Sequence, residues 1–366
     1  MDDPGPPPAL RAWIEETVGG PSRGWRRLVS GNSRTTWAAD VDHDGADVLA
    51  LAVRVDEGDG PFSGTPLTLA REAGVYAALQ GRPVAIPRRY GYDAGLRALA
   101  LERVGGAPAW DEDVLAGVLR EAARLHALDA GTVDLPGAGR RASADLDLWA
   151  AIADARLPAR SPLVDFAVDL LRETFPGEPE RLVVVHGDLG IGNVLWDGTR
   201  VTALLDWELT HYGDPHDDLA FLTVRSALHG LPLPGFGDAA REHYAAPAGL
   251  ALDPARLRYW QAVGVLRNLV TCLASIANPV RGRDRLVHHL LVPSLDRLLL
   301  GRLAGLVDVA LPAPAPLEAA AALPGGDVFA EIARELGDLV PAIPDADRRQ
   351  RARRMRHLLA QLAETW

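Results

Sequence analysis

The sequence predicts an α+β protein with two lobes, an N-terminal lobe built on an antiparallel sheet and a mainly helical C-terminal lobe. Short apolar runs separated by turn residues dominate the first third of the 366-residue chain. Further along, apolar residues recur at spacings of three and four, which is typical of helices. One strand-rich unit, at residues 182–205, interrupts this helical part.

The N-terminal third begins with a short helix at residues 8–18, closed by Gly19-Gly20. A small-residue loop, Ser30-Gly31-Asn32-Ser33, joins the first two strands of a hairpin meander. The pattern predicts strands at residues 25–29, 35–41, 48–55, 89–92 and 97–104, and a helix at residues 68–79.

The helical part begins after Gly105-Gly106. Helices are predicted at residues 111–128, 162–174, 217–228, 254–276 and 288–306, and two amphipathic helices at 325–364. The predicted organisation is an N-terminal helix (1–19), a sheet lobe (20–105), a helical lobe (106–310), an Ala- and Pro-rich linker (311–324) and a helical C-terminal extension (325–366).

The composition is that of a globular protein, with 48% apolar residues. No uninterrupted apolar stretch approaches the roughly 20 residues of a membrane helix. The acidic, proline-rich N-terminus does not have the pattern of a signal peptide. Cys272 is the only cysteine, which excludes an internal disulfide. These features predict a cytoplasmic protein without a membrane partner, and a homodimer is compatible with them.

The net charge is −11, which disfavours a nucleic-acid partner because phosphate backbones require a basic face. Every basic residue other than histidine is an arginine, since the sequence contains no lysine. A phosphate-binding loop of the G-x-x-x-x-G-K type and a lysine Schiff base are therefore excluded.

The most informative motif is His186-Gly187-Asp188, followed by Asn193 five residues later and by Asp206 thirteen residues after that. Asp197-Gly198 predicts a tight hairpin turn, which brings Asn193 and Asp206 back to the same open end. Asp188 lies on the loop just before this hairpin. Phosphoryl transfer needs such a set, because it requires a base for the attacking hydroxyl and oxygen ligands for magnesium.

These residues resemble the aminoglycoside-phosphotransferase and choline-kinase family, a branch of the protein-kinase-like fold, over about residues 20–310. The strongest portion runs from Val183 to Leu222 and includes Gly-Asp-Pro-His-Asp-Asp-Leu-Ala. The resemblance implies a two-lobed phosphotransferase with an alcohol group as acceptor, using Mg²⁺ and ATP or GTP.

In the helical lobe the resemblance makes Asp188 the catalytic base on a loop that His186 orders. It makes Asn193 and Asp206 magnesium ligands, and Asp218 a support for the loop. Glu208 matches a position that in some members approaches the metal or the γ-phosphate, so it is a third predicted metal ligand.

In the sheet lobe the resemblance implies nucleotide contacts. Gly31 and Asn32 belong to the loop over the phosphates, although a full G-x-G-x-x-G is absent. Glu72 matches the helix partner of the residue that holds the α- and β-phosphates. Glu102 and Val104 match the interlobe connection, whose backbone would read adenine or guanine.

Arg54 departs from the family pattern because it stands where the family has that phosphate-holding lysine. An arginine and a lysine are not interchangeable at a fitted site. Either Arg54 is a working phosphate ligand, or the chain is a nucleotide- or metabolite-binding pseudokinase. We prefer the first reading because the groups of the helical lobe are intact and because arginine here resembles the kinase-like domains found with acyl-CoA dehydrogenases.

A metal-dependent phosphohydrolase is a weaker alternative. It would use residues whose spacing matches no common metal motif, namely His186, Asp188, His211, His216 and Asp217.

The acceptor is the least determined part of the prediction. Arg225, Trp260 and Arg267 are candidate substrate residues in the cleft, with packing as the preferred reading for each. No acidic cluster marks a site for a polycationic aminoglycoside. A hydroxyacyl thioester or other hydroxylated metabolite is preferred over an antibiotic, on resemblance.

Overall fold

The computed structural model of the protein describes residues 5–28, 34–43, 47–58, 60–159, 161–231, 233, 235–278 and 286–311, with the single residues 334, 353 and 356. The predicted phosphate loop with Gly31 and Asn32 lies outside these residues. So do the predicted linker, except for Leu311, and the predicted C-terminal extension, except for those three single residues.

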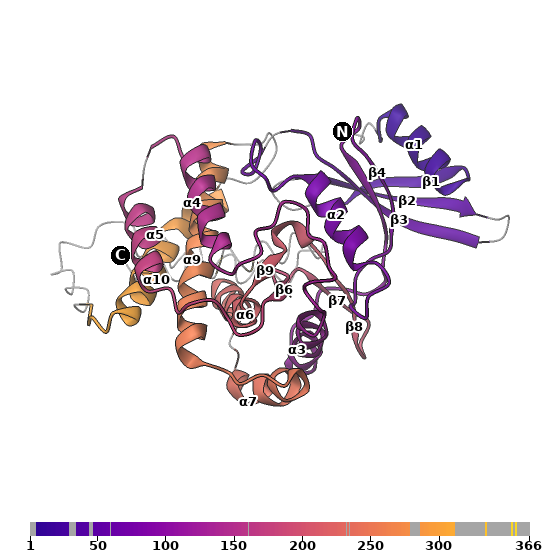
Figure 1. The fold of residues 1–366 in the computed structure, drawn as a ribbon. Helices are drawn as coiled ribbons and strands as arrows, with labels where there is room; N and C mark the ends of the chain where they lie inside the picture. The colour runs from indigo at the N-terminus through magenta and orange to yellow at the C-terminus, as the bar shows by residue number, and fades with distance from the viewer. Residues whose placement is uncertain are drawn as a thin grey trace.

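The N-terminal lobe is a five-stranded antiparallel sheet with the strand order β1-β2-β3-β5-β4 (Figure 1). A helix covers each face. On the long central strand β3, Leu51 and Val53 point to the face that packs on α1. Arg54, next along the same strand, therefore points to the opposite face, where α2 lies. The elements of this lobe are α1 (Pro8–Val18), β1 (Ser22–Leu28), β2 (Thr35–His43), β3 (Asp47–Val55), α2 (Leu69–Leu79), β4 (Arg89–Asp93) and β5 (Ala98–Glu102).

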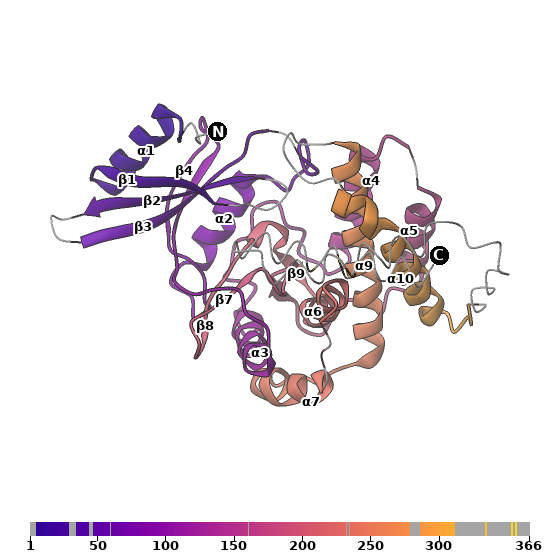
Figure 2. The same ribbon diagram turned by 180° about the vertical axis from the view of Figure 1, so that it is seen from behind.

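The C-terminal lobe is mainly helical, with two small two-stranded sheets at its contact with the N-terminal lobe (Figures 1 and 2). Its long helices are α3 (Glu112–His126), α4 (Ala144–Arg156), α5 (Pro162–Glu173), α6 (His216–Leu228), α9 (Pro254–Ala277) and α10 (Leu286–Leu306). Its shorter elements are β6 (Val183–Val185), β7 (Val194–Trp196), β8 (Val201–Leu204), a 3₁₀ turn (Trp207–Leu209), β9 (His211–Gly213), α7 (Phe236–Ala240), a π-helical turn (Arg241–Ala245) and α8 (Ala246–Ala248).

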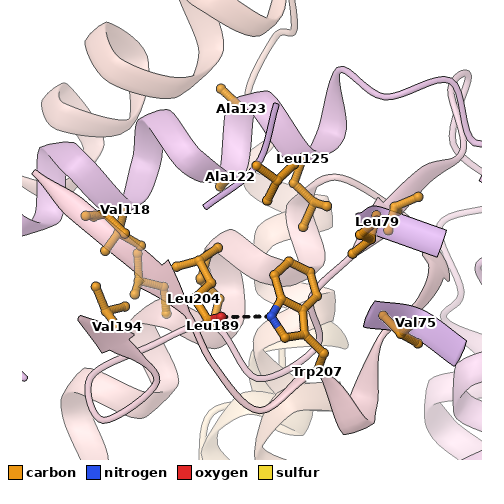
Figure 3. Packing of buried hydrophobic residues seen from close by; sticks show 14 of the residues in the cluster. Val75, Leu79, Val118, Ala122, Ala123, Leu125, Leu189, Val194, Leu204 and Trp207 are labelled. Atoms are coloured by element: carbon orange, nitrogen blue, oxygen red, sulfur yellow. Dashed lines mark hydrogen bonds between the residues drawn. The ribbon is translucent and has the colours of Figure 1, made fainter. Parts of the chain in front are cut away.

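The largest of the apolar clusters joins the two lobes. It combines α2 and the inner face of β5 with α3 and with the segments around the predicted site. Trp207 is fully buried at its centre, and its indole N–H donates to the carbonyl oxygen of Leu204 at 2.8 Å (Figure 3). Because Trp207 follows Asp206 directly, burial of the indole anchors that carboxylate at the lobe boundary.

A second apolar cluster is built from α4, α5, α6, α9 and α10. By length and composition, α9 would be long enough to cross a membrane, but 67% of its apolar window is buried inside the fold. Its composition is therefore explained by its central place in the helical core.

The predicted fold class is confirmed, with an antiparallel sheet lobe followed by a helical lobe. Helix α4 was not predicted, although Leu146, Trp149 and Ala153 have helical spacing and are buried. Strand β9, which pairs with β6 over only three residues, was not predicted either. A strand of that length has too few residues to show an alternating pattern.

Candidate active site

The loop that carries Asp188 is held in place by one buried carboxylate. The side chain of Asp218, at the start of α6, accepts hydrogen bonds from the backbone N–H groups of His186 at 2.8 Å and Gly187 at 2.9 Å. Gly187 has φ of +83°, and a Cβ there would lie 2.5 Å from the carbonyl oxygen of Leu209. Only glycine fits this combination of positive φ and close approach.

Asp218 is itself braced from α3. The Nε2 of His126 lies 3.0 Å from the Asp218 carboxylate, and the Nδ1 of His126 lies 2.7 Å from the hydroxyl of Tyr244. Burial alone would raise the pKa of Asp218. The hydrogen bond and charge of His126, with the charge and backbone N–H of His186, have the larger effect and lower the pKa to about 2. Asp218 is therefore an ionised support for the loop.

Asp188 is oriented from two sides. The side-chain amide of Asn193 donates to the Asp188 carboxylate at 2.8 Å and to its backbone carbonyl at 2.9 Å. On the other side, the Nε of Arg225 lies 3.5 Å from Oδ1. Burial raises the pKa of Asp188 above its ordinary value, and Arg225 opposes that rise. A fixed carboxylate with a raised pKa is suited to accept a proton.

His186 lies beneath this loop and is fully buried. Its ring centroid is 4.5 Å from that of Trp207, and its Nδ1 accepts the backbone N–H of Asp188 at 3.2 Å. Burial lowers the pKa of His186, which favours the neutral ring. These contacts fit the predicted role of ordering the loop.

Asp206 is placed by the hairpin of β7 and β8. Residue Asp197 accepts the backbone N–H groups of Thr199 and Arg200 and so closes the turn, and Gly198 has φ of +99°. The hairpin returns to Asp206, which has φ of +60°, a left-handed conformation that is uncommon for residues other than glycine. The backbone reverses there, between strand β8 and the buried Trp207.

Two arginines share one buried glutamate at the lobe boundary. Arg54 Nη1 lies 2.7 Å from Oε1 of Glu72 and 2.6 Å from Oδ1 of Asp206. Arg34 Nη1 bonds the other oxygen of Glu72 and lies 2.9 Å from Oε2 of Glu208. Arg54 thus connects Glu72 to Asp206, a predicted metal ligand. Arg34 connects the other oxygen of Glu72 to Glu208, a second predicted metal ligand.

Arg34 was not predicted from the sequence. It is only 4% exposed, and it also donates to the carbonyl oxygen of Leu67 at 3.3 Å. Nothing in its spacing distinguishes it from the many surface arginines of the chain. Its one signal is its position directly after the predicted phosphate loop.

Glu208 is held at this boundary by side chain and backbone. Its backbone carbonyl accepts Arg71 Nη1 at 2.7 Å, and Arg71 also bonds the carbonyl oxygen of Thr210. Burial, reinforced by the charge of Asp206, raises the pKa of Glu208 to about 7 despite the cation of Arg34. Glu208 would therefore ionise fully when another cation joins the site.

The chemistry of this donor set fits a divalent metal. Asn193, Asp206 and Glu208 all offer oxygen atoms, which are the ligands that Mg²⁺ prefers. Burial raises the pKa of Asp206, but the charge and hydrogen bond of Arg54 outweigh this and lower it. A deprotonated, 38% exposed carboxylate is accessible to an ion.

At the interlobe connection, the backbone N–H of Glu102 donates to Arg88 and that of Arg103 to Ala50. The Glu102 side chain is exposed and accepts the Arg88 N–H at 3.2 Å. The N–H groups of Glu102 and Arg103 are thus used within the sheet, and the nucleobase contact at Glu102 and Val104 stays a prediction.

Two predicted substrate residues lie in the helical core. Trp260 is 1% and Arg267 is 2% exposed. Arg267 Nη2 lies 2.5 Å from carboxylate oxygens of both Asp145 and Asp217, which join α4, α6 and α9. These contacts fit the packing reading, whereas Arg225 beside Asp188 fits the cleft reading.

The residues of the weaker phosphohydrolase alternative do not form one cluster, although His211 and Asp217 lie 3.1 Å apart. Among the described residues, the one group of three with metal-ligand geometry is Asp145, His211 and Asp217, and Arg267 already occupies its carboxylates. His216 is 2.7 Å from Asp214 instead. The geometry gives this alternative no support.

The sequence profile of the phosphotransferase enzyme family matches residues 24–260, and the chain belongs to this family. Acyl-CoA dehydrogenase family member 11 of Gallus gallus is 30% identical over 132 residues, covering 35% of this chain and 17% of that protein. The Mus musculus protein of the same name is 28% identical over 163 residues, covering 39% and 21%. The chain therefore spans only a small part of these relatives.

Solved structures show the same fold. Choline kinase of Cryptosporidium parvum matches with a TM-score of 0.57 and 13% identity, over 78% of this chain and 90% of its own. Macrolide 2′-phosphotransferase of Brachybacterium faecium matches with a TM-score of 0.54 and 22% identity, over 75% and 99%. The protein-kinase-like fold, the family and the phosphotransferase class predicted from the sequence are confirmed, and the sequence relatives carry the acyl-CoA dehydrogenase name that the prediction also indicated.

The buried cluster around Arg267 makes a prediction about stability. Arg267→Met removes the guanidinium that bonds both Asp145 and Asp217 and leaves the neighbouring His211 to neutralise two buried carboxylates. The free energy of unfolding should therefore fall by about 3–5 kcal/mol. Denaturant titration measures this, with the half-exposed Arg172→Met as control. Adding Asp145→Asn and Asp217→Asn should restore part of the loss. An unchanged free energy of unfolding together with a higher KM for the acceptor would instead show that Arg267 binds substrate.

Glu208 makes a prediction about pH. Its raised pKa means that the folded protein binds this proton more tightly than the unfolded chain, so its contribution to stability is present below about pH 4.5 and is lost as the pH rises to about 7. Without metal, Glu208→Gln should therefore gain stability relative to the parent protein between pH 5 and pH 8, by on the order of 2 kcal/mol. A difference that is constant over this range, or matched by the exposed Glu242→Gln, would contradict the assignment.

Proposed function

We propose that this protein is a Mg²⁺-dependent small-molecule kinase that transfers the γ-phosphate of ATP or GTP to a substrate hydroxyl. The observation that carries the proposal is the placement of Asp188. It is a fixed carboxylate with a raised pKa, bonded to Asn193, on a loop that also leads to the oxygen ligands of Asp206 and Glu208.

In the proposed reaction, the acceptor oxygen forms a bond to the γ-phosphorus while the bond from that phosphorus to the bridging oxygen breaks. The hydroxyl proton passes to Asp188, and the nucleoside diphosphate leaves. Asn193 and Asp206, with Glu208, would hold the metal ions, which neutralise charge on the phosphates. The chain's own contribution is positioning and electrostatics.

On the donor side, we propose that Arg54 takes the role of the phosphate-holding lysine. It extends from β3 toward α2, pairs with Glu72 and is 13% exposed. Arg34 supports this role, because it keeps Glu72 neutralised when Arg54 turns toward phosphate. The alternative is a pseudokinase that binds nucleotide or metabolite and transfers nothing.

On the acceptor side, we propose a neutral or anionic hydroxylated metabolite, with a hydroxyacyl thioester as the preferred class. Arg225 supports this choice, because its guanidinium lies beside Asp188, the proposed acceptor of the hydroxyl proton. A polycationic aminoglycoside would bring like charge to this position. The names of the dehydrogenase relatives are compatible with an acyl substrate. We further propose that the protein is cytoplasmic and that it binds neither nucleic acids nor membranes.

Asp188→Asn tests the base. It keeps the shape and the contact with Asn193 but cannot accept the proton, so kcat should fall by about 10²–10⁴ while nucleotide affinity stays unchanged. The assay is γ-phosphate consumption over a panel of hydroxylated metabolites and antibiotics, with nucleotide affinity from calorimetry. The exposed Asp169→Asn is the matched control. An undiminished kcat in Asp188→Asn would refute the assignment.

Arg54 separates the kinase from the pseudokinase. If Arg54 holds the donor phosphates, Arg54→Met should raise the KM for nucleotide by about tenfold or more, and Arg54→Lys should recover part of it. The acceptor KM should not move. Normal nucleotide binding by the parent protein, with no transfer to any acceptor and no slow hydrolysis, would favour the pseudokinase.

A further inference from the structure

A cavity of about 980 Å³ lies at the interlobe connection. It is bounded by residues 82–86, by Glu102 to Gly106 of the connection, by α3 and by the hairpin of β7 and β8. Figures 1 and 2 show α3 and this hairpin side by side. The lining includes none of Arg54, Asp188 or Asp206, but it does include Glu102 and Val104, which the resemblance assigns to the nucleobase contact. Its volume suits a small-molecule site.

Four arginines from three separate segments surround this cavity. Arg82 precedes β4, Arg120 and Arg124 lie one turn apart on α3, and Arg200 lies at the hairpin turn. Each guanidinium has five N–H donors. Arg82 donates to the carbonyl oxygen of Thr132 at 3.0 Å, Arg120 Nη1 lies 3.5 Å from a ring nitrogen of His243, and Arg200 Nε lies 3.5 Å from Oδ2 of Asp197. The remaining donors of Arg120 and Arg200, whose side chains are exposed, can reach a ligand.

The three carboxylates in the lining are engaged within the fold. Asp197 accepts the N–H groups of its own turn, and Glu102 accepts the N–H of Arg88. Glu121, only 6% exposed, accepts the N–H of Ala85 at 3.0 Å and a bond from Arg124. With four arginines against three carboxylates, the lining has a small excess of positive charge on a chain whose net charge is −11.

The cavity wall is connected to the proposed active site through hydrogen bonds. The carbonyl oxygen of Ala85 accepts the N–H of Leu204 at 2.7 Å, and its N–H donates to Glu121. Leu204 lies two residues before Asp206, and the same hairpin begins directly after Asn193. A ligand that draws Arg120 and Arg200 together would therefore act on the hairpin that presents two of the three predicted metal ligands, Asn193 and Asp206.

We propose that this cavity is a regulatory site for a small phosphate-bearing metabolite, which the arginines bind through charge-assisted hydrogen bonds. Its apolar part would lie on Val84, Ile86 and Val201. Binding at this site does not depend on the proposed kinase function, whereas an effect on turnover does.

Calorimetry with inorganic pyrophosphate, without metal, tests the binding. Arg120→Gln with Arg200→Gln removes two opposing donors and leaves the Glu121 pair intact. The Kd for pyrophosphate should rise at least about tenfold, while the Kd for ATP stays within about twofold. The matched control is Arg172→Gln with Arg241→Gln, which removes the same charge from exposed arginines paired with aspartates elsewhere.

The outcomes are distinct. No binding of pyrophosphate to the parent protein, equal binding by the cavity variant, or an equal loss in the control variant would each overturn the proposal. So would a parallel loss of ATP affinity, because the cavity would then not be separate from the donor site. If binding follows the arginines, turnover with and without pyrophosphate then tests regulation, and the cavity variant should not respond. A kinase assay that fails entirely would leave the binding result standing and refute only the proposed function.

Discussion

The carboxylate of Asp218 is the interaction on which the rest of the site depends. The loop that carries Asp188 cannot satisfy its own backbone, because it is neither helix nor sheet. Asp218 accepts two consecutive N–H groups of that loop, and His126 braces it from α3. A single buried anion thus connects the loop to helices α3 and α6 and fixes the position of Asp188.

The second constraint is electrostatic and lies at the lobe boundary. Arg34, Arg54, Glu72, Asp206 and Glu208 bring two cations and three carboxylates into one partly buried group. Such a group is stable only when charges are paired, and it favours the arrival of another cation. Because the chain contains no lysine, arginine does this pairing, and each of the two guanidinium groups bonds a different oxygen of Glu72.

Much of the fold and part of the site followed from the sequence, for local reasons. The boundaries of α1 agree with the prediction because Gly19 ends the helix in a left-handed conformation. The hairpin turn at Asp197 was predictable because its hydrogen bonds join residues within three positions of one another. The very short β9 and Arg34 carry no such local signature, since β9 exists only through pairing with β6 and Arg34 is defined by a glutamate 38 residues away.

By itself the sequence determined the order of the lobes, the family, and the set of groups Asp188, Asn193 and Asp206, because spacing and turn chemistry are local properties of a chain. Only the tertiary structure decided which arginines belong to the site. Arg225 lies beside Asp188, whereas Arg267 is enclosed between Asp145 and Asp217. The physical reason is that the environment of a charge is set by neighbours from distant segments: Arg267 is 122 residues from Asp145. A guanidinium in the sequence looks the same whether it faces a substrate or neutralises the core.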